Sequence, residues 1–184
     1  MRTRRALLAG GAGALAALAG CSSLNPRSGS GESAQRSSSG LAVRVRPTGD
    51  VGGLDSLSMT VDQVGLTPRG RDEGALRAGD SVDLLANDGD PVEFFVVGFP
   101  TGEYTDLSLD GGGGTATADG EDAPARFADG ALTYDVDYRL RANTTTVVTA
   151  GVAVTRTDGA YALAADPDAT AVTTRDGRPE TTER

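Results

Sequence analysis

The sequence predicts an all-β protein, an antiparallel β-sandwich, and three observations support that class. Apolar residues recur with a period of two, most clearly in "ALTYDVDYRL", which is the pattern of a strand with one buried face. Clusters of Gly and Asp, such as "NDGD" and "RTDGAY", separate these runs as turns. No helical period persists beyond one or two turns. Short strands with this spacing are typical of a sandwich.

The clearest strand covers residues 131–140. Its even positions are apolar or aromatic and its odd positions from Thr133 onward are polar, so we expect one face in the core and the other in water. Residues 41–45, 148–154 and 161–163 show the same alternation. Tyr134 and Tyr138 lie on the apolar face; core packing is the expectation for both, and lining a binding groove is the alternative.

Two other segments depart from simple alternation. In "SLSMTVDQVGL" the apolar parity changes between Val61 and Val64, which predicts a β-bulge near Asp62 and Gln63. The run "VEFFVVGF" is apolar on both parities, as in a strand that is buried on both sides or that lies at a sheet edge. Because all eight aromatic residues lie in the later two-thirds of the chain, we expect the packing centre there.

The N-terminal segment has the pattern of an export signal. A basic stretch with Arg2, Arg4 and Arg5 precedes an uncharged run over residues 6–20. This run fits a signal-peptide core and is shorter than the roughly 20 residues that span a bilayer. The segment around Arg4 and Arg5 resembles the twin-arginine export signal.

The single cysteine ends the stretch "LAGC", which resembles the lipobox of bacterial and archaeal lipoproteins. The resemblance implies that Cys21 is lipidated and that the chain is cut before it. Plain secretion or an uncleaved anchor is the alternative. We therefore divide the chain into a twin-arginine-type signal peptide (1–20), Cys21 with a flexible Ser/Gly linker (21–40), the β-sandwich domain (41–174) and a disordered tail (175–184).

The charge of the chain narrows its partners. All 17 basic residues are Arg, there is no His, and 26 acidic residues give a net charge of −9. Nucleic acids and anionic membrane surfaces select basic patches, so neither is an expected partner. The acidic, lysine-free composition resembles that of proteins from salt-loving archaea, and predicts that folding needs salt to screen the mutual repulsion of carboxylates. Ordinary acidity in a GC-rich genome is the alternative.

The middle of the chain carries a family resemblance. The stretch "SVDLLANDGDPVEFFVVGFPTGEYTDLSLD" contains "DLL" at residues 83–85 and a Pro-x-Gly-x-Tyr element from Pro100 to Tyr104. It resembles a family of bacterial and archaeal lipoproteins known as domain of unknown function 4382, over about residues 41–172. The resemblance implies a prealbumin-like or immunoglobulin-like β-sandwich and a lipoprotein location, and no activity. Independently of any family, Pro100 and Gly102 favour a type I turn.

The composition also limits the chemistry. Without His or Lys there is no imidazole base, Schiff-base amine or phosphate-loop lysine, and a lipidated Cys21 leaves no thiol for zinc or copper. No cofactor is expected, with Ca²⁺ as the open alternative because oxygen ligands gather in two turns. The candidate ligands are Asn87, Asp88 and Asp90 in one turn and Asp166 and Asp168 in the other. Asp-rich turns are equally typical of a salt-adapted surface.

Three further features remain. Asp135 and Asp137 share a strand face at about 6.5–7 Å, a spacing that a glycosidase could use, but Arg139 and Arg141 on the same face favour a solvated, ion-paired surface. Asn143 begins the glycosylation triplet Asn-Thr-Thr. The glycine run in "LDGGGGTATADG" lacks the lysine of a phosphate loop and is expected to be a flexible loop.

Together these observations predict a lipid-anchored protein on the extracellular face of the cell membrane. Its β-sandwich is expected to be a non-catalytic interaction or binding domain for a surface protein or ligand. Two alternatives stay open: a Ca²⁺-binding or small-ligand-binding domain that serves a transporter or enzyme, and a carboxylate-based hydrolase.

Overall fold

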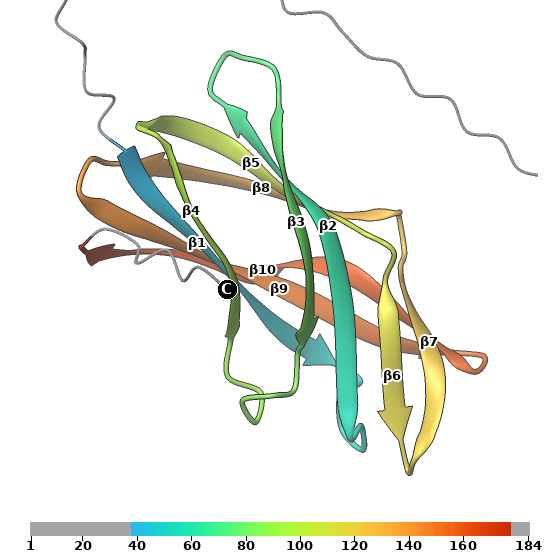
Figure 1. Ribbon diagram of the computed structural model, residues 1–184. Helices are drawn as coiled ribbons and strands as arrows, with labels where there is room; N and C mark the ends of the chain where they lie inside the picture. The colour runs from blue at the N-terminus through green and yellow to red at the C-terminus, as the bar shows by residue number, and fades with distance from the viewer. Residues whose placement is uncertain (1–37, 178–184) are drawn as a thin grey trace, which may run out of the picture. The chain divides into compact units, whose positions relative to one another are not determined.

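The computed structural model describes residues 38–177, which form ten β-strands and contain no helix (Figure 1). The all-β class is therefore confirmed, and no helix in this range is available to cross a membrane. In chain order the strands are β1 (Ser38–Gly49), β2 (Ser56–Pro68), β3 (Gly74–Asp83), β4 (Val92–Pro100), β5 (Gly102–Asp110), β6 (Gly114–Ala118), β7 (Glu121–Phe127), β8 (Ala131–Leu140), β9 (Thr144–Thr157) and β10 (Ala160–Asp176).

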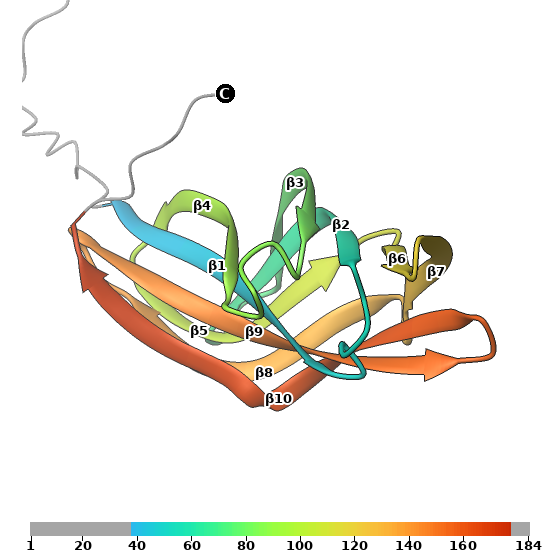
Figure 2. The same ribbon diagram turned by 90° about the horizontal axis from the view of Figure 1, so that it is seen from below.

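The strands form two packed sheets that share β2. The first sheet has the order β4-β1-β9-β10-β7-β6 and the second the order β3-β2-β5-β8. The start of β2, at Ser56 and Leu57, pairs with β6, and the rest of β2 pairs with β3 and β5. Strand β8 of the second sheet packs against β9 and β10 of the first, as the view from below shows (Figure 2). The predicted sandwich is confirmed.

The direction of two strand pairs differs from the expectation. β1 with β9 and β10 with β7 run parallel, whereas every other pair is antiparallel. Apolar alternation indicates which face of a strand is buried and says nothing about the direction of its neighbour. The parallel pairs therefore could not be anticipated from the pattern.

The strands also extend beyond the expected limits of the domain, residues 41–174. β1 begins at Ser38 and β10 ends at Asp176. Ser39 is buried, and its hydroxyl donates a hydrogen bond to the Phe99 carbonyl at 2.9 Å. The last residues of the segment expected to be a linker, and the first of the expected tail, thus belong to paired strands.

The core lies between the two sheets and spans the whole domain. Tyr134 crosses it from β8, and its buried hydroxyl donates to the Gly151 carbonyl of β9 at 2.8 Å. The expectation of a packing centre in the later two-thirds is wrong, because β1 and β2 contribute side chains with no exposed surface, including Leu41, Val43, Leu57 and Met59. The buried residues of β1 and β2 are not aromatic, whereas β5, β7, β8 and β10 add buried aromatic residues to aliphatic ones.

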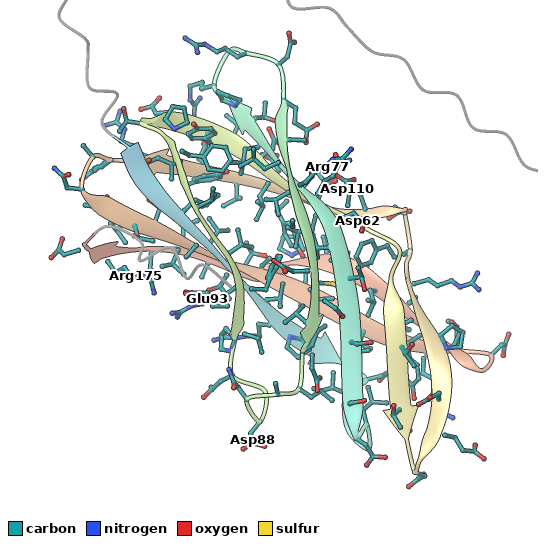
Figure 3. The ribbon with its side chains drawn as sticks, in the orientation of Figure 1. Asp62, Arg77, Asp88, Glu93, Asp110 and Arg175 are labelled. Atoms are coloured by element: carbon teal, nitrogen blue, oxygen red, sulfur yellow. The ribbon has the colours of Figure 1, made fainter. Side chains whose placement is uncertain are left out.

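The predicted bulge in β2 is confirmed. The register of β2 against β3 shifts between Val61 and Gln63. Val61 and Val64 can therefore both point into the core, and both are fully buried. The labelled side chains of Asp62, Arg77 and Asp110 lie near this shift, where β2, β3 and β5 run side by side (Figure 3).

Strand β4 is an edge strand, one of the two options that its composition left open. It pairs with β1 alone. Glu93 of β4 accepts a hydrogen bond from Arg44 of β1 at 3.1 Å and another from Arg175 of β10 at 3.2 Å (Figure 3). This carboxylate ties the edge strand to two other strands of its sheet.

Three of the four glycines at residues 111–114 are closely packed, all but Gly112, which corrects the expectation of a flexible loop. β5 and β6 lie one after the other along the same edge of β2, and the run forms the corner between them. A Cβ on Gly111 would overlap the Thr60 carbonyl, and one on Gly114 would overlap the Ser58 carbonyl. Only glycine lets the chain approach the backbone of β2 this closely.

Candidate functional site

The candidate site is an open hollow of about 460 Å³ at the end of the domain where β1 begins. It lies between the turn that joins β4 to β5 and the end of β8. The first side contributes Thr101, Gly102 and Glu103, and the second contributes Arg139, Leu140, Arg141 and Ala142.

The Pro-x-Gly-x-Tyr element builds one side of this hollow. The Tyr104 hydroxyl donates to the Pro100 carbonyl at 3.0 Å and so closes the turn on itself. The Tyr104 ring stacks on Tyr138 of β8, with centroids 5.5 Å apart and planes 13° from parallel. The rings of Phe99 and Tyr104 pack edge to face, with centroids 6.4 Å apart. This aromatic packing fixes the turn against β8 and therefore fixes both sides of the hollow.

An ion-pair chain crosses the outer surface beside the hollow. Arg139 pairs with Glu103, Glu103 pairs with Arg69 of β2's C-terminal turn at 3.4 Å, and Arg69 pairs with Asp137 at 2.6 Å. All four side chains are well exposed, so each pair adds little to stability. Arg141 is exposed and belongs to none of the five ion pairs in residues 38–177.

This arrangement suits the recognition of an anionic group. Two guanidinium groups, those of Arg139 and Arg141, line the hollow with a single carboxylate, Glu103. An arginine fork matches the geometry of a carboxylate or phosphate. The phenols beneath offer no acid–base chemistry near neutral pH, because burial raises the pKa of Tyr104 and of Tyr138 above the ordinary value of 10.

The first pair of predicted Ca²⁺ ligands lies in the exposed loop between β3 and β4. Asp88 adopts a left-handed backbone conformation, with φ of 53°, and the labelled side chain lies at the loop (Figure 3). The backbone N–H of Asp90 donates to the Asn87 carbonyl at 2.9 Å. These three residues therefore form a tight turn.

The second pair lies in an irregularity of β10, where the register against β9 shifts between Asp166 and Ala171. The Asp166 carboxylate accepts the Thr48 hydroxyl at 2.6 Å and the backbone N–H groups of Asp168 and Ala169. These bonds, the Thr48 bond above all, lower the pKa of Asp166. Among residues 38–177, no three acidic side chains gather closely enough to hold a metal ion.

Asp135 and Asp137 both lie on the outer face of β8, as the alternation predicts. Asp137 pairs with Arg69, and Asp135 lies directly opposite Asp106 of β5. Tyr134 and Tyr138, on the other face, are 2% and 5% exposed, so the packing interpretation of these two residues is confirmed.

Asn143 is exposed in the turn between β8 and β9 and has a φ of 60°. Thr145, the third residue of its triplet, is buried and donates a hydrogen bond to the Gly177 carbonyl at 3.0 Å. Cys21, Arg4 and Arg5, the residues of the predicted lipidation and export signals, lie outside the described residues.

Sequence reasoning did not single out Glu103 or Arg69 as members of a site. Their ion pairs join three strands that are far apart in the sequence, and only strand order brings them together. The sequence offered one signal for the site: basic residues follow acidic ones along 135–141, and the alternation puts Arg139 and Arg141 on one face of the strand.

Comparison with protein-family models and with curated protein sequences finds no match. Among solved structures, the chain is similar to a candidate cell adhesion protein from Bacteroides eggerthii, with a TM-score of 0.32 and 13% sequence identity. The match covers 77% of this chain and 55% of that protein, so the chain spans about half the length of the protein that it matches. A likeness this distant has no bearing on function.

Proposed function

We propose that the protein is a lipid-anchored cell-surface protein whose β-sandwich is a non-catalytic interaction domain. The observation that carries the proposal is the open hollow between β5 and β8, lined by Arg139 and Arg141. An open, exposed hollow that carries two guanidinium groups favours the docking of an anionic group on a partner.

The anchoring part of the proposal is supported by the sequence around Cys21. β1 begins at Ser38, seventeen residues after this cysteine. A flexible chain of that length reaches about 20–25 Å. The tether would keep the domain close to the lipid surface while leaving it free to turn toward a partner. Firm anchoring would need two acyl chains, because one chain holds a protein only marginally.

Cross-linking on intact cells tests the proposal. The reagent should react with carboxyl groups, because the chain has no lysine. The wild-type protein should lie in the membrane fraction and give a discrete heavier band that mass spectrometry can identify. Cys21→Ser should lose both the membrane location and the band.

A second variant separates binding from anchoring. Arg139→Gln with Arg141→Gln should stay in the membrane fraction but lose the heavier band, since the guanidinium groups of the hollow are gone. Arg46→Gln with Arg126→Gln is the matched control, because both side chains are exposed and lie on other strands; this control should keep the band. If the wild type and Cys21→Ser appear alike in the medium, the anchoring is refuted. If the anchored wild type gives no band, the interaction role is refuted.

A further inference from the structure

Strand β8 has a free edge. It is the last strand of the second sheet and pairs with β5 alone. Its outward residues Asp137 and Arg139 have side chains that are 72% and 57% exposed. Apolar and polar residues alternate from Leu132 to Leu140, and the strand contains no proline. The register of β8 against β5 shifts once, between Asp135 and Tyr138. An edge strand presents unpaired backbone groups and is a template for a further strand.

The charges along this edge are self-complementary. Residues 135–141 read "DVDYRLR", with two acidic residues before Tyr138 and two basic residues after it, the second of which, Arg141, directly follows the end of β8 at Leu140. When two such strands pair antiparallel about Tyr138, Asp137 lies opposite Arg139 of the second copy and Asp135 lies opposite Arg141. Two-fold symmetry repeats each contact, so four oppositely charged pairs form and no like charges meet.

We propose that two copies of this chain associate through β8, antiparallel and centred on Tyr138. The second sheets of the two copies then join into one continuous sheet. This association is separate from membrane anchoring, because it needs no lipid and forms between chains in solution.

The surroundings of Asp135 and Arg141 support this pairing. Asp135 lies directly opposite Asp106 within its own chain, a like-charge arrangement that is unfavourable across a strand pair. Arg141 belongs to no ion pair of the described residues. Pairing between copies gives each of these two side chains an opposite charge.

Asp137 and Arg139 can keep their present partners in such a pair. Asp137 uses its Oδ1 atom to accept from Arg69, and Arg139 uses its Nη2 atom to donate to Glu103. The Oδ2 atom of Asp137 and the other guanidinium nitrogens of Arg139 take no part in these two ion pairs, so they suit a contact with the second copy. The backbone carbonyl of Arg139 accepts the Thr146 hydroxyl at 3.0 Å and retains a second lone pair. The ion pairs of the two copies would then form one continuous row of alternating charges across the two-fold axis.

The other edge strands are less suitable. β3 has a register shift as β8 does, and in addition a left-handed glycine within the strand, Gly79 with a φ of 64°. β4 has a single charged residue, Glu93, which already pairs with Arg44 and Arg175. In neither strand does antiparallel pairing with a second copy place several acidic residues opposite basic ones.

The test uses the full-length chain with Cys21→Ser, so that no lipid contributes, and measures mass by sedimentation equilibrium. An all-acidic variant carries Arg139→Asp and Arg141→Asp, and an all-basic variant carries Asp135→Arg and Asp137→Arg. All samples share one salt concentration of about 1 M, which screens the net charge but leaves contacts between touching groups.

The parent chain should dimerise, and the dissociation constant of each single-sign variant should rise by more than about tenfold. A mixture of the all-acidic and all-basic variants should form a one-to-one heterodimer, because all four pairs are restored. The four-residue swap, with acidic and basic positions exchanged, should dimerise like the parent. Circular dichroism should show that every variant stays folded.

Two controls sharpen the result. Arg46→Asp with Arg126→Asp changes the net charge as the all-acidic variant does, but away from β8, and should leave the dimer intact. Arg69→Gln removes the partner of Asp137 within the chain and should also leave it intact. A parent that stays monomeric up to about 1 mM overturns the proposal. So does dimerisation of the single-sign variants at parental strength, or failure of their mixture to associate.

Discussion

Substituting alanine at single positions of the glycine run tests the packed corner between β5 and β6. Gly114→Ala places a Cβ against the Ser58 carbonyl, and neither strand can move aside without disturbing its neighbours. Overpacking of this kind costs about 1–3 kcal/mol. Separating the strands also weakens the nearby bond from the Thr60 N–H to the Gly113 carbonyl, 2.8 Å long, at a further cost of about 0.5–1.5 kcal/mol. We therefore expect a loss of about 2–4 kcal/mol.

The matched control is Gly112→Ala, two residues away. No atom lies within 4 Å of a Cβ at Gly112, and its φ is not in the left-handed region. Alanine there should be neutral, or should stabilise the domain by about 0.4–1 kcal/mol, because it restricts the unfolded chain. Thermal melting at high salt measures both variants. For a domain of this size, Gly114→Ala should lower Tm by about 6–14 °C. Equal effects of the two variants, or none from Gly114→Ala, would refute the close packing of this run.

Three further outcomes follow from the same structure. Tyr134→Phe should cost about 1–3 kcal/mol in denaturant unfolding, because it leaves the buried Gly151 carbonyl without its donor at 2.8 Å; an unchanged midpoint would contradict this role. The pKa of Asp166 is lower in the folded chain than its ordinary value of 3.8. The hydrogen bonds to the Asp166 carboxylate therefore stabilise the fold above about pH 4, and this stabilisation is lost as the pH falls through the folded-state pKa. In Thr48→Val, Tm should therefore fall less steeply than in the wild type between pH 5 and 2. An equally steep fall in both proteins would argue against a role for the Thr48–Asp166 bond. Finally, lowering NaCl from about 3 M to about 0.1 M should partly or fully unfold the domain, because a chain with 26 acidic residues repels itself once screening is lost; identical melting curves would remove the case for salt adaptation.

The sequence by itself determined the fold class and the faces of individual strands. Period-two alternation is a local property, and it identified the buried residues of β8 and the bulge beside Asp62, because side-chain direction alternates within any strand. The preferences of Pro100 and Gly102 likewise predicted a turn, and its stabilising bond from Tyr104 to Pro100 spans only four residues.

Only the tertiary structure decided the features that depend on which strands are neighbours. The parallel pairing of β1 with β9 joins segments about a hundred residues apart, and nothing local sets its direction. The role of Gly111 and Gly114 depends on the nearby backbone of β2, which the pattern of a glycine run cannot reveal. The sequence marks Asp166 only as a candidate metal ligand; its bond to Thr48, from a strand more than a hundred residues earlier, is visible only in the structure. The sequence of β8 already carried the charge order from Asp135 to Arg141, but only the strand order left that edge free to use it.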